Sequence, residues 1–138
     1  MAAVLVDSNI LLDVMTEDPR WFGWSANALA RAADAARLVI NPIVYAEVSV
    51  RYSRIEELEL ALPKAMFDRE PIPYEAAFLA AKAFVRYRRQ GGAKRSPLPD
   101  FFVGAHAAVA GYQLLTRDAA RYRSYFAKLA LLAPRSQA

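Results

Sequence analysis

Residues 4–9 read VLVDSN, a short run of branched apolar residues that ends at an acidic residue, Asp7. Such a run is typical of a buried β-strand, so we expect the fold to begin with a strand over residues 4–6. Similar apolar runs follow at Leu38–Ile40 and Gln113–Leu115, and helical sequence separates them. Strands that alternate with helices indicate a mainly parallel sheet covered on both faces, which is an α/β architecture.

The residues between the apolar runs predict where helices start and stop. Asp18-Pro19 and Asn41-Pro42 are helix-start signals, whereas Gly91-Gly92 and Gly111 are helix-end signals. From these signals and the apolar periodicity we expect helices over 8–14, 18–37, 41–53, 55–65, 74–90, 100–110 and 119–126. We expect further strands over 38–40, 113–115 and 129–132, with a short one inside 66–73. No internal repeat or linker interrupts the chain, so residues 1–138 are expected to form a single domain.

The composition excludes several classes of protein. Hydrophobic residues make up 56% of the chain, which is too many for a disordered protein. No apolar run reaches the roughly 18 residues that a membrane span needs, so we expect no membrane partner. The N-terminus lacks the positive segment of a secretory signal and meets a charge at Asp7, so we do not expect it to be such a signal.

The chain has no cysteine and a single histidine, His106. Thiolate nucleophiles, disulfides and zinc sites built from Cys or several His are therefore excluded. A metal ion bound by this chain would need mostly oxygen ligands, which favours magnesium, manganese or calcium. His106 lies six residues after Asp100, about 240° further round a helix, so we interpret it as structural.

Four acidic residues stand out by their positions. Asp7 and Asp118 follow predicted strands, Asp100 opens a predicted helix, and Glu47 lies inside an otherwise apolar helical segment. The carboxyl ends of parallel strands meet at one edge of the sheet, so all four could converge there. Four carboxylates in one place repel each other, and a divalent cation with water and phosphate oxygens would relieve that repulsion.

Each acid also has a purely structural interpretation. Asp7, Asp100 and Asp118 could each cap or neutralise the start of a helix. Glu47 could form an i,i+4 ion pair with Arg51, worth only a few tenths of a kcal/mol.

Four segments occur in an order that resembles PIN-domain nucleases, and more narrowly the VapC toxins of type II toxin–antitoxin systems. The segments are VLVDSN (4–9), AEV (46–48), LPDFFVGAHA (98–107) and LLTRD (114–118), and the resemblance covers nearly the whole chain. It implies a PIN-like three-layer α/β/α sandwich with a mainly parallel central sheet.

The resemblance also implies a site and an activity. The acidic metal-binding and catalytic set would be Asp7, Glu47, Asp100 and Asp118. The supporting polar residues would be Ser8, Asn9 and Thr116; Ser8 stands where many relatives have Thr, and the swap keeps the hydroxyl. The implied activity is RNA cleavage that depends on Mg²⁺ or Mn²⁺, in a bacterial or archaeal cytoplasm, with inhibition by a VapB-like antitoxin. A homodimer stays open as an alternative assembly.

A basic stretch precedes Asp100, because residues 76–99 contain six Lys or Arg and no acid. It is either a solvated face or a track for RNA phosphates leading to the acidic edge. The RNA-binding candidates in it are Arg86, Arg89, Lys94 and Arg95. Trp21 and Trp24 are either core residues or part of an apolar patch for the antitoxin.

Two rival functions use the same architecture. A phospho-acceptor regulatory domain needs an acidic pair after the first strand, and Ser8-Asn9 after Asp7 disfavours it. A non-catalytic module that binds RNA or a protein partner stays open as the second alternative.

Overall fold

The first strand, β1 (Ala3–Val6), is the centre of the sheet, and all four of its residues are buried. It pairs in parallel with β2 (Arg37–Ile40) on one side and with β4 (Gln113–Leu115) on the other. β3 (Phe67–Arg69) extends the sheet beyond β2, and β5 (Leu131–Leu132) extends it beyond β4. The order is therefore β3-β2-β1-β4-β5 with every pair parallel, which confirms the predicted α/β class.

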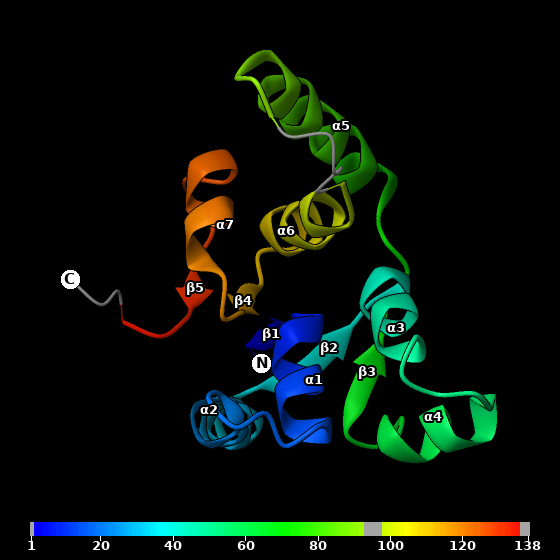
Figure 1. Cartoon of the computed structure of the whole chain (residues 1–138). Coiled ribbons are helices and arrows are strands. Elements are labelled where there is room, and N and C mark those ends of the chain that lie inside the picture. Colours follow the sequence, from blue (N-terminus) through cyan, green and yellow to red (C-terminus); the bar gives the residue numbers. More distant parts are fainter. Residues whose placement is uncertain (1, 93–97, 136–138) are drawn as a thin grey trace.

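The structure is a computed structural model that describes residues 2–92 and 98–135. The helices in this part of the chain are α1 (Ser8–Met15), α2 (Phe22–Ala35), α3 (Pro42–Ser49), α4 (Ile55–Ala61), α5 (Tyr74–Arg89), α6 (Leu98–Ala110) and α7 (Ala119–Tyr125). Figure 1 shows α1 and α2 together on one side of the sheet and α5 and α6 on the other, with α3 and α4 beside β3. The result is the three-layer sandwich expected from the sequence. No helix in the described residues is long and apolar enough to cross a membrane.

The strand order locates the crevice where a ligand can bind. The chain runs outward from β1 through β2 to β3, then returns through α5 and α6 to place β4 on the other side of β1. Right-handed crossovers in opposite directions put their helices on opposite faces of the sheet. The reversal between β1 and β4 leaves a crevice at their carboxyl ends, directly after Val6 and Leu115.

The second helix starts later than the sequence predicted. Asp18 does not begin it; its carboxylate accepts hydrogen bonds from the backbone N–H of Arg20 (2.9 Å) and Trp21 (2.8 Å). These bonds close a turn, and regular helix begins only at Phe22 and ends at Ala35. The Asp-Pro signal therefore marks the turn before the helix, because the Asp side chain satisfied backbone donors outside the helix.

The predicted limits of three further helices and of the last strand also differ from the structure. α3 ends at Ser49 rather than 53, and α4 ends at Ala61 rather than 65, two residues before Pro63. A proline disfavours helical backbone at the residue before it, which explains the early end of α4. α6 begins at Leu98, so that Pro99 lies in its first turn, where a missing N–H costs nothing. β5 covers only Leu131–Leu132 of the predicted 129–132.

Gly104, in the middle of α6, allows α7 and the residue after it to pack closely against this helix. A β-carbon at this position would lie 2.7 Å from the Phe126 ring and 2.9 Å from the Tyr122 ring. Both rings are buried, so neither can move away cheaply. A side chain larger than hydrogen would therefore push these two aromatic residues off α6.

We predict that Gly104→Ala lowers the free energy of unfolding by roughly 1–3 kcal/mol, because the added methyl overpacks this contact. The matched control is Gly23→Ala in α2, where a β-carbon would meet nothing within 4 Å. That change should be neutral or stabilise by up to about 1 kcal/mol, because alanine is the better helix former. Urea unfolding of both variants measures the difference, and equal effects would contradict the close packing at Gly104.

Candidate active site

Asp7 lies at the carboxyl end of β1, inside the crevice, with only 3% of its surface exposed. Its Oδ2 accepts hydrogen bonds from the hydroxyls of Thr116 (2.8 Å) and Tyr122 (2.9 Å). Its Oδ1 accepts a bond from the backbone N–H of Ser8 (2.8 Å), so Asp7 also caps α1 as its structural interpretation predicted. Three elements, β1, β4 and α7, therefore converge on this one carboxylate.

Burial raises the pKa of the Asp7 carboxyl from 3.8 to about 6. The charges of Asp100 and Glu47 raise it further, while the hydrogen bonds from Thr116 and Tyr122 act in the opposite direction. Tyr122 itself is kept protonated, because burial and the nearby carboxylates raise the pKa of its phenol. It can therefore only donate to Asp7.

Asn9 and Thr116 link the segments that follow β1 and β4. The Asn9 amide donates to the Thr116 hydroxyl (3.3 Å) and accepts from the backbone N–H of Arg117 (3.2 Å). The Thr116 hydroxyl also accepts from the backbone N–H of Asp118 (3.1 Å). Asn9 and Thr116 thus hold the ends of β1 and β4 next to each other, which fits the supporting role expected for them.

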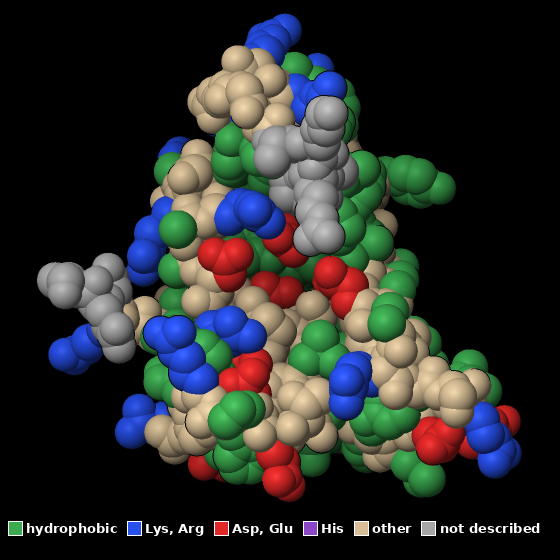
Figure 2. Space-filling model, in the orientation of Figure 1, with side chains coloured by type: hydrophobic (Ala, Val, Ile, Leu, Met, Phe, Trp, Pro, Cys, Tyr) green, Lys and Arg blue, Asp and Glu red, His purple; other side chains and the backbone are tan. Residues whose placement is uncertain are grey.

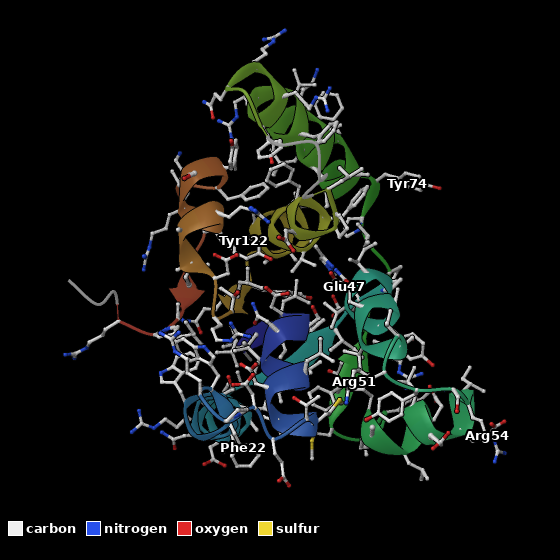
Figure 3. All side chains as sticks on the ribbon, viewed as in Figure 1. Phe22, Glu47, Arg51, Arg54, Tyr74 and Tyr122 are labelled. Carbon is white, nitrogen blue, oxygen red and sulfur yellow. The ribbon has the colours of Figure 1, made fainter. Side chains whose placement is uncertain are left out.

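Glu47 is half-buried on α3 and accepts a hydrogen bond from the Ser8 hydroxyl (3.0 Å). The ion pairs of the described residues do not include one between Glu47 and Arg51, which removes the structural interpretation. Burial and the charge of Asp100 raise the pKa of the Glu47 carboxyl. Figure 3 shows Glu47 on α3 and Tyr122 on α7, on either side of the crevice.

Asp100 and Asp118 complete the acidic cluster from α6 and from the segment after β4. Arg121 donates to Asp100 Oδ2 at 2.5 Å, yet burial and the charge of Asp118 still raise the pKa of the Asp100 carboxyl. Asp118 is exposed and makes no capping hydrogen bond to α7, contrary to its structural interpretation. The space-filling view shows carboxylates gathered around a hollow at the centre of this face (Figure 2).

The donor set fits a hard divalent cation, since it consists of carboxylate oxygens that repel each other. Within residues 2–92 and 98–135, however, no three acidic or histidine side chains lie close enough to bind one ion together. Asp7 Oδ2 is occupied by two hydroxyls, and Asp100 is paired with Arg121. Mg²⁺ in proteins often takes one or two carboxylates and keeps several waters, which suits this arrangement.

Three contacts in the site could not be predicted from the sequence, because no local pattern indicates them. They are the Tyr122 phenol on Asp7, the Arg121–Asp100 pair, and an ion pair in which Arg117 donates twice to Asp13 (2.7 and 2.9 Å). Asp13 is buried on α1 and also accepts from Ser25 of α2 (2.7 Å). The i,i+3 spacing in the sequence places Arg121 near Asp118. No local pattern indicates that Arg121 also contacts Asp100 of α6.

The described basic residues of this stretch lie on α5, and three of them line a cleft against α7 that none of the four acids lines. Lys82, Arg86 and Arg89 line this cleft of about 440 Å³ together with Tyr125. Arg86 donates to the Tyr125 backbone carbonyl (2.8 Å) and lies over its ring. Lys94 and Arg95 fall outside the described residues.

The other singled-out residues have structural surroundings. His106 is buried, with Nδ1 3.1 Å from the Asn41 amide nitrogen, which agrees with its interpretation as structural. Trp21 is half-buried, and the guanidiniums of Arg20 and Arg117 each lie 5.2 Å from its ring centre. Trp24 packs against the core. Both tryptophans are thus partly buried, and their role in an apolar patch for the antitoxin stays a prediction.

The sequence profile of the PIN domain family matches residues 4–127 of the chain. None of the curated proteins matches it in sequence. Among solved structures, a VapBC complex from Rickettsia felis bound to a promoter DNA fragment is similar, with a TM-score of 0.73 and 16% identity. This match covers 96% of the present chain and 99% of the other.

Two further structures are similar at the same level. VapBC from nontypeable Haemophilus influenzae gives a TM-score of 0.71 at 18% identity, covering 95% of this chain and 97% of that one. FitAcB from Neisseria gonorrhoeae gives 0.65 at 16% identity, covering 93% and 95%. At these identities the likeness concerns the fold.

The raised pKa of Asp7 predicts how the stability of the metal-free protein depends on pH. Between about pH 4 and 6 the folded state keeps a proton that the unfolded state releases, so the free energy of unfolding falls as pH rises. The change in the pKa of Asp7 corresponds to a loss of at most about 3 kcal/mol in the free energy of unfolding, since one pKa unit equals about 1.36 kcal/mol. Asp7→Asn should flatten most of this slope, measured by urea unfolding in EDTA.

The control for this measurement is Asp34→Asn, an exposed position on α2 that should keep the wild-type slope. Glu47 and Asp100, whose pKa values are also raised, should leave a smaller slope of the same sign in Asp7→Asn. Burial lowers the pKa of His106, which adds a slope of the opposite sign in wild type and variant alike, so the difference between the two curves is the measure. Equal slopes in wild type and Asp7→Asn between pH 4 and 6 would contradict a raised pKa at Asp7.

Proposed function

Because the chain belongs to the PIN domain family, we propose that it is a divalent-metal-dependent endoribonuclease that hydrolyses RNA phosphodiester bonds, and the toxin of a VapBC-type pair. The observation that carries this proposal is the convergence of Asp7, Glu47, Asp100 and Asp118 at the carboxyl ends of β1 and β4. Burial raises the pKa values of Asp7, Glu47 and Asp100, and the charge of a neighbouring acid adds to the shift in each case.

The four carboxylates would hold a Mg²⁺ or Mn²⁺ ion, some directly and others through water. When bound, such an ion supplies a water of lowered pKa and withdraws charge from the scissile phosphate. Asp7 is fixed for this purpose by Thr116 and Tyr122, and its Oδ1 accepts only one described hydrogen bond.

Glu47 is suited to accept a proton from the attacking water. Ser8 donates to its Oε1, and Oε2 accepts no hydrogen bond among those of the described residues, so Oε2 would act as the base. Burial raises the pKa of this carboxyl, and a base is most effective when its pKa approaches the working pH. No activated nucleophile is needed, and the reaction would proceed without a covalent intermediate.

The RNA would approach along α7. Arg121 and Tyr122 lie at the acidic cluster, and Tyr125 lies about one helical turn further on, at the basic cleft against α5. Lys82 and Arg89 are exposed in this cleft and can bind phosphates, whereas Arg86 is already engaged by Tyr125. Lys94 and Arg95 stay predictions of RNA contacts.

The partner would be a VapB-like antitoxin, by analogy with the toxin–antitoxin complexes that share this fold. An acidic crevice attracts an Arg or Lys side chain, which could pair with the carboxylates in place of a metal ion. The cytoplasm of a bacterium or archaeon would be the compartment, and a homodimer stays open.

One observation favours the second candidate, a non-catalytic module that binds RNA or a partner. In the described residues no three acids lie close enough to hold one ion. A module that only binds RNA or a protein would not need a metal ion at this place. A cleavage assay separates the two candidates, since the binding module would retain RNA without cutting it in either Mg²⁺ or Mn²⁺.

We predict that Asp100→Asn and Asp7→Asn each reduce Mg²⁺-dependent cleavage of RNA by at least 10–100-fold, roughly the loss seen when residues that only support metal ligands are changed. Asp34→Asn, with the same change of charge at an exposed position, should cleave at the wild-type rate. Circular dichroism checks that the variants fold. Wild-type rates in both crevice variants would reject the proposed site.

A second prediction concerns the RNA path. In EDTA, Arg89→Ala should make the plot of log K against log salt less steep by about 0.7, because one phosphate contact to single-stranded RNA is lost. Arg88→Ala is the matched control: Arg88 is the preceding residue on α5 and is also exposed, but it does not line the cleft. Identical slopes in both variants would place the RNA elsewhere.

A further inference from the structure

Arg121 is the single cation, among the described residues, that forms an ion pair with any of the four acids. Its Nη1 lies 2.5 Å from Asp100 Oδ2, and the charge of Asp118 also acts on it. The pair joins α7 to α6 across the mouth of the crevice. Any cation that binds Asp100 must therefore contend with a positive charge already present.

The Arg121–Asp100 pair differs from the neighbouring Arg117–Asp13 pair in how easily another cation could replace the arginine. Arg117 uses two nitrogens on a carboxylate that is only 3% exposed and is also bonded by Ser25. Arg121 makes one contact, and the side chains of Arg121 and Asp100 are 37% and 27% exposed. The first pair is a structural link, whereas the second is singly bonded and partly exposed and therefore costs less to open.

The charge balance of the crevice also favours replacement of Arg121 on Asp100 by a divalent cation. Among the described residues, no cation forms an ion pair with Asp7, Glu47 or Asp118, so the cluster still favours a further cation. A doubly charged ion on Asp100 would meet Arg121 as a like charge at a distance of a few ångströms. The guanidinium stays charged at all ordinary pH values, so it cannot remove this repulsion by losing a proton.

We propose that Arg121 is an exchangeable counter-ion of the acidic cluster, which competes with the divalent cation for Asp100 and so lowers the affinity of the site for metal. This inference rests on the proposed metal site. Its consequence is that metal binding displaces the guanidinium from Asp100, toward the mouth through which the RNA phosphate must enter. Arg121 would be a positioning residue for the metal in this role.

The direct test is Mn²⁺ binding to the purified full chain, measured by electron paramagnetic resonance at neutral pH and about 0.15 M salt. We expect Arg121→Gln to bind Mn²⁺ about tenfold more tightly, because an adjacent Arg changes the affinity of a carboxylate for a proton by roughly 10–1,000-fold. The matched control is Arg123→Gln, an exposed arginine on the same helix. It should bind within about twofold of wild type, since salt screens distant exposed charges.

An unchanged or weaker Mn²⁺ affinity in Arg121→Gln would overturn the inference. Weaker binding would mean that Arg121 holds Asp100 in place for the metal instead of competing with it. The failure of the metal site itself gives a different result, because wild type would then show no Mn²⁺ binding that Asp100→Asn removes. That result would overturn the proposed function and this inference together.

A second measurement uses the wild-type protein and does not depend on the folding of a variant. In ¹⁵N NMR spectra, the side-chain Nε–H signal of Arg121 should shift when Mg²⁺ is added, because the guanidinium leaves Asp100. The signal of Arg117 is the internal control and should stay in place, since its pair with Asp13 is buried and doubly bonded. A Mg²⁺ titration that moves neither signal would overturn the exchange.

Discussion

The structure depends on one constraint, the burial of a carboxylate at the end of the central strand. Asp7 is surrounded by the sheet and α7, and an ionised acid in such a place is costly unless hydrogen bonds compensate it. The compensating donors come from far apart in the sequence: Thr116 after β4 and Tyr122 on α7. Each can reach Asp7 only if β1 and β4 are paired in their observed register, so the sheet and the site form together.

Packing on the helical side serves the same carboxylate. The absence of a side chain at Gly104 lets Tyr122 and Phe126 lie directly against α6. That close approach fixes the Tyr122 ring, and its hydroxyl then meets Asp7 at 2.9 Å. The aromatic core of this layer and the polar crevice are therefore parts of one arrangement, and a disturbance of the core should reach the acids through Tyr122.

Electrostatics divides the arginines near the crevice into two roles. Arg117 closes a buried, doubly bonded pair with Asp13 that joins the segment after β4 to α1, and through Ser25 to α2. Arg121, four residues further along the chain, makes a single contact with Asp100 at the partly exposed mouth. If the proposed nuclease function holds, the first keeps the crevice in shape and the second adjusts how strongly it attracts metal. Lys82, Arg86 and Arg89 line the cleft between α5 and Tyr125 of α7, and none of the four acids lines it.

The sequence by itself determined the strands, their parallel class and the helix ends at Gly91 and Gly111, because these follow from local hydrophobic pattern and backbone freedom. It also indicated the four acids, since strand ends and an acid in an apolar helix are visible in one dimension. Helix starts were less certain: Asp18 closes a turn outside the helix, a choice made by its side chain after folding. Only the tertiary structure decided the partners of those acids, namely Tyr122 on Asp7, Ser8 on Glu47 and Arg121 on Asp100. The physical reason is that a hydrogen bond between residues 21 to 115 positions apart depends on how helices pack across the sheet, and no local pattern encodes that distance.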